Sequence, residues 1–555
     1  GPRWFKRLVP LRSAHPLTTV PRSEGSFPSQ PGRTRADERR GFRRSRAFAR
    51  TLPVDVTTTA IATPAPPARR ADFTPRLGGS YMFAVRESGK RALLFNGPQL
   101  GFDAPEKLLE LELHAPGIDL RGMTAPGIPV IGAGFNGHGV AWGVTTGASD
   151  TDDLYAERLV PGQPERYRYK GKVRAMDCRD ETLKYDSPPS DLLGQHTPES
   201  GTKVVRICRT VHGPVEARAG NVAYARRYAA WGRELETLSG LSAVNTARTV
   251  GDVDRAMRKV TWNENLMAAD AGGHIGYWHP GLFPLRARRW DERLPLPGTG
   301  KAEWRGLLPR SRIPAVIDPR QGWLANWNNL PARGWTSGDG TARKRLDGPL
   351  FRVTWLRTLV RRLARKPSFA GIEALLRESG TVAQQRRALG PRLRRMARGA
   401  TGAAATVLGT LRAWDGSYAR ADAGGTVDPG VATWDAFRAA MADELVRRAG
   451  KGARWLAGED VLGDLYGGYH HGAPYHFFDL THLQSQAMLR LPRAGWRRAA
   501  RAAFAVLAKR FGSDDPAGWR EPRRMYETGA SGATAPPPIP FFDRGTYEQL
   551  VEVGP

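Results

Sequence analysis

The residue pattern of this chain changes along its length, and these changes constrain its fold more than any other feature. Residues 1–79 are rich in Pro, Arg, Ser and Thr without helical or strand periodicity, so we predict a disordered or non-native leader. Residues 80–345 contain short apolar runs broken by Gly, Pro and Asp, which is typical of a sheet. Residues 346–525 have apolar residues three and four positions apart, which predicts helices. Residues 526–555 regain strand character, and we expect them to return to the sheet core in truncated form.

The balance of charges would suit a protein that binds nucleic acid or another anionic surface. The sequence has 84 Lys and Arg against 54 Asp and Glu, which gives a net charge of +30. A large share of this excess lies in residues 1–79, and Arg greatly outnumbers Lys, as in proteins of GC-rich genomes. No RNA-binding motif or zinc-ligand spacing occurs. We therefore predict no nucleic-acid partner, and a basic binding protein is kept only as a third hypothesis.

Cysteine use and hydropathy say little about the compartment. Cys178 and Cys208 lie in two strand-like segments. They could pair across neighbouring strands or be two separate buried thiols, and pairing is favoured only in an exported protein. No apolar run is long enough for a transmembrane helix, and the N-terminus shows no readable signal peptide.

Two motifs suggest cofactors, but we predict a site at neither. Gly132, Gly134 and Gly137 have the GxGxxG spacing of dinucleotide-binding loops. A strand rather than a helix follows them, so no helix N-terminus would face a pyrophosphate, and a hairpin is expected. The irregular spacing of four histidines, without an acidic or Cys partner set, favours a polar loop over a metal site; they are His470, His471, His476 and His482.

Ser80 follows two glycines in RLGGSYMFAV and begins a strand-like run. A serine hydroxyl is a poor nucleophile until a base removes its proton. If the chain is cut between Gly79 and Ser80, the released α-amine of Ser80 could be that base. Gly79 would permit the strained geometry in which Ser80 Oγ attacks the preceding carbonyl. Because Gly-Gly-Ser alone is more often a turn, this hypothesis needs support from other motifs.

Several motifs downstream of Ser80 occur in the order and approximate spacing of one enzyme family. They are NGPQLGF (96–102), GFNGHGVAWGVTTGASDTDDLYAERL (134–159), TVHGPV (210–215), NLMAADAGGHIGYWHPG (265–281), RLPLPGTGKAEWRGLLP (293–309), GWLANWNNLP (322–331) and DRGTYEQLVEV (543–553). With these motifs the chain resembles, from Ser80 to about Val553, the penicillin acylase family of N-terminal-nucleophile hydrolases.

The resemblance implies a fold class and an assignment of the segments. The fold would be α+β, with a four-layer αββα N-terminal-nucleophile hydrolase core and a largely helical insertion. Residues 80–345 would form the sheet core of the family's β chain, and residues 346–525 would form the helical region of the same chain.

The resemblance also implies roles for five residues. Ser80 would be the nucleophile, and its released α-amine would be the general base. Asn265 through its side-chain amide and Thr146 through its backbone N–H would stabilise the tetrahedral oxyanion. Gln99 would position the amine and the substrate, and Arg286 would support the asparagine and the amine.

A calcium site is implied by the acidic segment GASDTDDLY. Members of the family bind calcium in this segment, so Asp150 and Asp153 would contribute carboxylates and Asp152 its carbonyl. The spacing can wrap a hard cation with two side chains and one carbonyl. A capped acidic loop is the alternative.

The implied activity is that of an amidohydrolase, a penicillin or acyl amide acylase that cleaves linear amides through an acyl-enzyme on Ser80 after autoproteolysis. Apolar segments around Met82, Leu100 and Val144 suggest an apolar acyl pocket. The sequence does not choose between β-lactams, acyl-homoserine lactones and lipopeptides. An inactive fragmentary paralogue of the family is the alternative.

Family members also have an α chain cut from the same precursor, and the resemblance implies a secreted or periplasmic protein. We match none of residues 1–79 to such an α chain. We therefore expect the polypeptide alone to expose apolar patches on its sheet and to lack amidase activity until an α segment is supplied.

Overall fold

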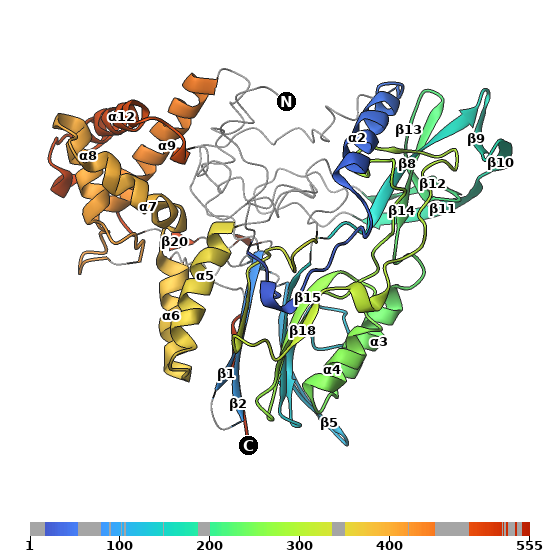
Figure 1. Ribbon diagram of the computed structural model, residues 1–555, viewed down its shortest axis with the longest axis horizontal. Helices are drawn as coiled ribbons and strands as arrows, with labels where there is room; N and C mark the ends of the chain where they lie inside the picture. Colours follow the sequence, from blue (N-terminus) through green and yellow to red (C-terminus); the bar gives the residue numbers. More distant parts are fainter. Residues whose placement is uncertain are drawn as a thin grey trace.

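The computed structural model (Figure 1) describes most of the chain and shows a mixed α+β protein, which confirms that part of the fold prediction. The residues described are 17–53, 79–87, 90–100, 103–104, 107–147, 149–186, 200–335, 350–419, 421–449, 488–523, 525–526, 529–530, 539–540 and 547–555. The four histidines between residues 470 and 482 lie outside them. Among the described residues, none of the helices has the length and hydropathy of a membrane span.

A four-stranded sheet carries Ser80. Its strand order is β19-β1-β2-β23, with all neighbours antiparallel. Both faces of its central strands are buried, because Tyr81, Phe83 and Val85 alternate with Met82 and Ala84 along β1. The strands are β1 (Gly79–Glu87), β2 (Arg91–Gln99), β19 (Trp323–Asn326) and β23 (Gln549–Val553).

A seven-stranded sheet packs face to face against this first sheet. Its order is β18-β16-β15-β7-β6-β5-β4. The space between the two sheets holds Met82 and Ala84 of β1 together with Met267, Ala269 and Tyr277 of the second sheet. Its strands are β4 (Leu109–Ala115), β5 (Ile118–Thr124), β6 (Ala133–Asn136), β7 (Val140–Thr146), β15 (Glu264–Asp270), β16 (Ile275–Trp278) and β18 (Ala315–Ile317). The hairpin of β6 and β7 confirms the prediction for the GAGFNG segment.

Helices pack on the outer face of each of these two sheets, as Figure 1 shows. On the first sheet, Val353 and Leu356 of α5 and Ile372 of α6 pack against the side of β1 that carries Phe83. On the second sheet, Val253 of α4 packs near Trp142 of β7. These helices are α3 (Glu234–Asn245), α4 (Val250–Met257), α5 (Leu350–Leu363) and α6 (Phe369–Thr381).

A third sheet of eight strands is built around β8. It contains Cys178 opposite Cys208 on neighbouring strands, and the two sulfurs form a disulfide. The question that the sequence left open is thereby answered. The strands are β8 (Asp152–Val160), β9 (Gln163–Tyr169), β10 (Lys172–Ala175), β11 (Asp177–Asp186), β12 (Ser200–Thr210), β13 (Gly213–Ala219), β14 (Val222–Tyr228) and β17 (Leu296–Pro297).

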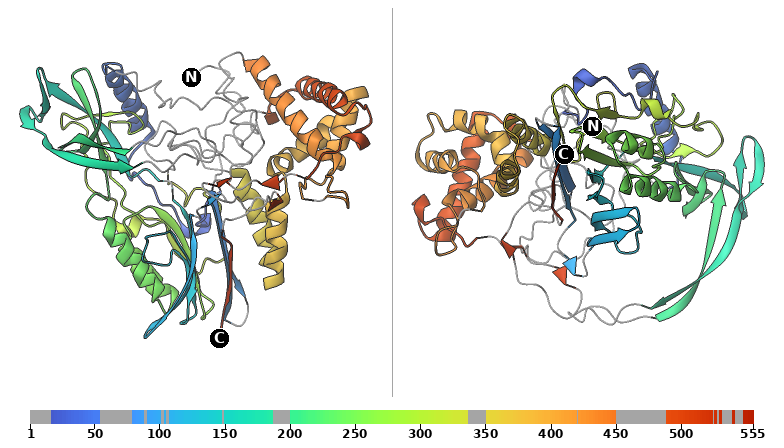
Figure 2. Two further views of the ribbon diagram at one scale, coloured as in Figure 1. Left: turned by 180° about the vertical axis from the view of Figure 1, so that it is seen from behind. Right: turned by 90° about the horizontal axis from the view of Figure 1, so that it is seen from below.

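The prediction of disorder in residues 1–79 is wrong for residues 17–53, which have a defined structure. Thr34 caps helix α2 (Arg35–Ala49) through a capping box with Asp37. Phe48 then packs its ring edge against Trp290 at a centroid distance of 6.1 Å. Sequence periodicity missed this helix because its buried side consists of the small residues Gly41, Ser45 and Ala49. The partners of its Phe48 lie more than 100 residues away in the sequence. Figure 2 shows α2 beside the third sheet.

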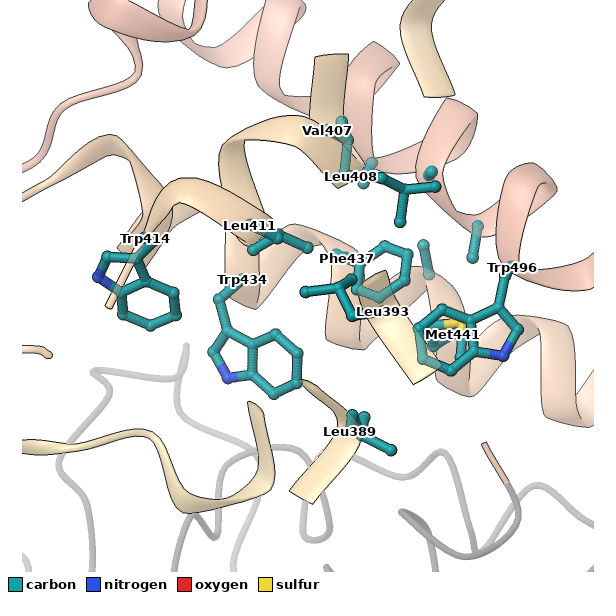
Figure 3. Close-up of a cluster of buried hydrophobic side chains, with 14 of the residues drawn as sticks. Leu389, Leu393, Val407, Leu408, Leu411, Trp414, Trp434, Phe437, Met441 and Trp496 are labelled. Atoms are coloured by element: carbon teal, nitrogen blue, oxygen red, sulfur yellow. The ribbon is translucent and has the colours of Figure 1, made fainter. Parts of the chain in front are cut away.

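Four helices pack into a separate cluster in the second half of the chain. Figure 3 shows its centre, where Trp434, Phe437 and Met441 of α9 meet Leu408 of α8 and Trp496 of α12. The cluster consists of α7 (Gln384–Ala397), α8 (Gly402–Ala413), α9 (Pro429–Ala449) and α12 (Arg493–Phe511).

The remaining elements are short. They are the 3-10 turns η1 (Arg22–Glu24), η2 (Arg310–Arg312) and η4 (Pro516–Gly518), and the two-residue strands β3 (Asp103–Ala104), β20 (Met525–Tyr526), β21 (Gly529–Ala530) and β22 (Ile539–Pro540).

Candidate active site

Ser80 lies at the beginning of β1, on an inner strand of the first sheet. Gly79 is opposite Gln99 and Ser80 is opposite Pro98 in the pairing with β2. Ser80 is only 4% exposed, and its backbone N–H donates to Asn328 Oδ1 at 2.8 Å. Because Gly79 and Ser80 are both residues of β1 in the uncut chain, this nitrogen is an amide rather than a free amine. A cut at this bond would leave the new amine beside Asn328.

Asn328 connects Ser80 to the second sheet. Its own backbone N–H donates to Asn326 Oδ1 at 3.0 Å, which holds the turn after β19. Its φ of 53° lies in the left-handed region, which Asn tolerates better than most residues. Its Nδ2 reaches the Thr146 carbonyl at 3.5 Å. No role was predicted for the asparagines of the segment GWLANWNNLP, although their repeated amides were an available signal.

Asn265 is held rigidly next to Thr146. Its Nδ2 donates to Thr145 Oγ1 at 3.0 Å and to the Thr146 carbonyl at 2.9 Å. Its Oδ1 accepts from Tyr277 OH at 2.6 Å and is 2.7 Å from His279 Nδ1. The pairing of β15 with β7 sets this arrangement, because it places Asn265 opposite Thr145 and Glu264 opposite Thr146. The structure thus brings together three predicted residues, Ser80, Thr146 and Asn265, through Asn328.

Gln99 lies at the end of β2, beside the beginning of β1. Its Oε1 accepts from Trp327 Nε1 at 2.9 Å, and the indole of Trp327 stacks on Tyr81 with ring centroids 4.9 Å apart. Gln99 therefore lies close to the Gly79–Ser80 bond, and its role in positioning the amine and the substrate stays a prediction. It is fixed there by a tryptophan that the sequence analysis did not single out.

The predicted apolar pocket around Met82, Leu100 and Val144 is wrong in its composition. Met82 is fully buried between the two sheets. Val144 packs in the cluster of α3 and α4, on the opposite face of the second sheet. Met82 and Val144 therefore contribute to two different cores rather than to one pocket.

Glu264, the neighbour of Asn265, has an altered acidity. Its carboxyl group is withdrawn from water although the residue as a whole is only partly buried, and this raises its pKa to about 8; the backbone N–H of Gly147 opposes the shift. A carboxyl group with this pKa is mostly neutral at pH 7. It therefore adds little negative charge beside Thr146 at that pH.

Arg286 lies among the three aspartates that the sequence analysis assigned to calcium. Its Nε is 2.8 Å from Asp153 Oδ2, and its Nη2 is 2.7 Å from Asp150 Oδ1. Nη2 also donates to the Asp152 carbonyl at 3.1 Å. Burial by itself would lower the pKa of Arg286, but the carboxylates of Asp150 and Asp153 outweigh it and raise the pKa above its ordinary value.

The three aspartates do not fit a calcium ion as they are arranged here. Their oxygens are ligands of the type that calcium prefers, but one carboxylate oxygen of Asp150, one of Asp153 and the Asp152 carbonyl each contact a guanidinium that is permanently charged. The Asp152 carboxylate pairs with Arg226 instead. Among the described contacts of Arg286, none reaches Asn265, so its predicted support of that asparagine stays a prediction.

Residues 19–30 of the N-terminal segment form hydrogen bonds with residues around the candidate site. Asn326 Nδ2 donates to Thr19 Oγ1 at 2.8 Å, and the Thr19 N–H donates to the Leu330 carbonyl at 3.1 Å. Gln30 accepts from the Arg286 backbone N–H at 3.0 Å. Residues of the N-terminal segment, which was predicted to be disordered or non-native, therefore contact both the turn after β19 and the backbone of Arg286.

Comparisons with known proteins identify a family and a fold. A sequence model of the penicillin amidase family matches residues 24–548, a range that begins within the N-terminal segment. In solved structures, the chain is similar to a thermostable penicillin G acylase from Alcaligenes faecalis, with a TM-score of 0.67 and 23% identity over 85% of this chain and 88% of that one. At this identity the likeness concerns the fold.

Curated relatives are similar to part of the chain. Penicillin G acylase from Escherichia coli is 32% identical over 64% of this chain and 41% of its own length. Penicillin acylase 2 proenzyme from Pseudomonas sp. (strain SE83) is 27% identical over 67% of this chain and 46% of its own length. Acyl-homoserine lactone acylase QuiP from Pseudomonas aeruginosa is 28% identical over 44% of this chain and 29% of its own length. The chain thus spans less than half the length of these relatives.

Proposed function

Because the chain belongs to the penicillin amidase family, we propose that it is an amidohydrolase that cleaves linear amides through an acyl-enzyme on Ser80. The observation that carries this proposal is the hydrogen-bond path from the Ser80 N–H through Asn328 to the Thr146 carbonyl, which Asn265 also contacts. The proposed nucleophile, base and oxyanion donors would then surround the beginning of β1, and this proximity supports the proposal.

The first step of the proposal is release of the α-amine. Ser80 Oγ attacks the Gly79 carbonyl carbon, the peptide C–N bond breaks, and the nitrogen takes up the hydroxyl proton. Water then hydrolyses the resulting ester, which leaves a Gly79 carboxylate and a Ser80 with free hydroxyl and amine. Asn328 Oδ1, which accepts from the amide N–H in the uncut chain, would orient this amine.

The second step is acylation of Ser80 by the substrate. The α-amine, with an ordinary pKa of about 8, accepts the hydroxyl proton as Oγ bonds to the substrate carbonyl carbon. Asn265 Nδ2 and the Thr146 N–H would stabilise the oxyanion. Asn265 Nδ2 donates to Thr145 Oγ1 and the Thr146 carbonyl in this structure, so one of its hydrogens must turn to the oxyanion. The amide C–N bond then breaks, the leaving amine takes the proton, and water hydrolyses the ester.

The proposal extends to the surroundings of the site. The two packed sheets with helices on their outer faces support a four-layer αββα N-terminal-nucleophile core with a helical insertion. The disulfide between Cys178 and Cys208 supports a secreted or periplasmic location, because disulfides persist in oxidising compartments. An α chain from the same precursor is the proposed partner. No step depends on calcium.

Intact-mass analysis and a substrate panel test the proposal. The purified chain is analysed for a cut between Gly79 and Ser80 and is then assayed with phenylacetyl-p-nitroanilide and with acyl-homoserine lactones, whose amides differ in acyl group. Cleavage at that bond together with hydrolysis of either class supports the proposal. A chain that is cut but hydrolyses neither, even with a family α chain added, would favour the alternative of an inactive paralogue.

A further inference from the structure

A row of polar groups with a buried histidine leads to the Oδ1 end of the Asn265 amide. Trp335 Nε1 donates to Ser149 Oγ at 2.8 Å, and Ser149 Oγ is 2.7 Å from His279 Nε2. His279 Nδ1 is 2.7 Å from Asn265 Oδ1. His279 is 0% exposed, so each of these groups must find its partner within the protein.

The direction of each hydrogen bond in this row follows from two backbone groups that cannot rotate. The Ser149 N–H donates to Asn263 Oδ1 at 2.7 Å, and Asn263 Nδ2 donates to the Pro280 carbonyl at 2.9 Å. These contacts fix which end of the Asn263 amide carries the hydrogens. Nδ2 of Asn263, 3.1 Å from His279 Nε2, must therefore be the donor, and Nε2 must be the acceptor.

The proton of His279 is thereby located on Nδ1. With Nε2 accepting, the neutral ring carries its one hydrogen on Nδ1, and Nδ1 then donates to Asn265 Oδ1. Burial lowers the pKa of His279 to about 3, so the ring is neutral over the range in which an amidase would work. The charged side chains that border the cavity beside His279, of about 490 Å³, are Asp254, Arg258 and Arg310.

We propose that His279 is a positioning residue that fixes the amide of Asn265, with Asn263 setting the tautomer of the histidine. Tyr277 alone could not do this, because its hydroxyl can donate to an oxygen or accept from an NH2 group. The Nδ1–H of His279 can only donate, so a flipped Asn265 would place its NH2 group against another donor. The hydrogen bond from His279 keeps Asn265 Nδ2 on the side of Thr146. Its role in turnover rests on the proposed function, in which Asn265 Nδ2 stabilises the oxyanion.

Two substitutions of His279 test the roles of Nδ1 and Nε2 separately. His279→Asn keeps an NH2 group near the position of Nδ1 and can still donate to Asn265. His279→Gln keeps polar atoms near the position of Nε2, facing Ser149 and Asn263, and loses the donor to Asn265. We expect kcat to remain within about threefold in the Asn variant and to fall about tenfold to a hundredfold in the Gln variant, with KM little changed in both.

Thermal unfolding of both variants provides the control for folding. Equal losses of kcat in the two variants at similar thermal stability would overturn the proposal, as would a loss confined to KM.

The protonation state of His279 can be measured without enzymatic activity, so this test can fail or succeed independently of the proposed function. Full-length protein labelled with ¹⁵N-histidine is examined by NMR at pH 7, and the signals of His279 are assigned by their absence in His279→Gln. We expect a neutral ring with its hydrogen on Nδ1, even if the wild-type chain hydrolyses no amide. A hydrogen on Nε2, or a charged ring, would overturn the proposal.

Discussion

At the scale of single residues, the site depends on side-chain amides that are oriented by their neighbours. Asn265, Asn326 and Asn328 each bond through both ends of the amide or through the adjacent backbone. An amide held in this way keeps its orientation, so stabilising an oxyanion requires only the exchange of one existing hydrogen bond when charge develops beside it. Three predictions belong to this scale.

We expect Ser80→Ala to abolish both cleavage of the Gly79–Ser80 bond and amide hydrolysis, because one hydroxyl would serve both reactions. Ser80→Cys should still be cleaved but hydrolyse amides poorly, since a thiol can perform the self-cleavage. Intact-mass analysis and an anilide assay measure the two outcomes. Retained cleavage in the Ala variant would rule out Ser80 as the nucleophile of that step.

Asn265→Ala should lower kcat by about two or three powers of ten, the usual loss for one oxyanion donor, and leave substrate affinity nearly unchanged. Steady-state kinetics on an acyl anilide give the two parameters separately. Circular dichroism of the variant shows whether the fold is retained. An effect on KM alone would contradict the assigned role.

Arg286→Gln should destabilise the protein by about 3 to 5 kcal/mol, because it leaves the buried carboxylates of Asp150 and Asp153 without their cation. Urea unfolding with and without calcium chloride measures this loss. Calcium should restore part of the stability of the variant and affect the wild type little. Arg288→Gln, at an exposed neighbouring position, is the control. Equal stabilisation of wild type and variant by calcium would show that the guanidinium does not replace the metal.

At the scale of elements, the third sheet contains a buried histidine between two glutamates that the motif TVHGPV did not reveal. His212, between β12 and β13, has its Nδ1 2.5 Å from Glu157 Oε1 and its Nε2 2.8 Å from Glu303 Oε1. Its ring stacks on Tyr155 with centroids 3.8 Å apart. Burial lowers the pKa of His212, but its hydrogen bonds to the two glutamates outweigh burial and raise it overall. The ring therefore joins β8 and the β12–β13 turn to the segment of Glu303.

The stabilisation by His212 should depend on pH. Because its folded pKa is raised, its contribution is complete below its unfolded pKa of about 6.5 and is lost as pH rises through the folded value. We expect His212→Asn to be less stable than wild type at pH 6, and the difference to shrink towards pH 9. Urea unfolding at several pH values measures the difference. His138→Asn, at an exposed position, should show no such trend, and a constant difference for His212→Asn would refute the assignment.

At the scale of the whole molecule, segments far apart in sequence complete one another. β23 pairs with β2 across more than 400 residues, and Gln549 donates to the Gly134 and Trp142 carbonyls of the second sheet at 3.1 Å each. The N-terminal segment packs against Trp290 and against the turn after β19. The stability of the site should therefore depend on residues distant from Ser80.

Trp290→Ala tests whether the N-terminal segment depends on this packing. Trp290 is buried against Phe48 and carries Arg44 over its ring at 4.5 Å. We expect a loss of about 3 to 5 kcal/mol and faster hydrogen exchange in residues 35–49. Trp262→Ala, at an exposed tryptophan, is the control. Unchanged exchange in α2 would mean that other contacts hold the segment.

The sequence by itself determined the family resemblance, and through it the choice of Ser80, Gln99, Thr146 and Asn265 as candidate site residues. Apolar periodicity and ordered motifs are local properties, so they can be read without a structure. The roles of Asn328 and His279 were decided by tertiary structure, because an amide or imidazole acquires a direction only from the groups packed around it. The same holds for Arg286, whose aspartate partners lie more than 130 residues away. It also holds for α2, whose Phe48 packs against Trp290 and against the third sheet. Strand pairing brings such partners together, and no local pattern encodes that pairing.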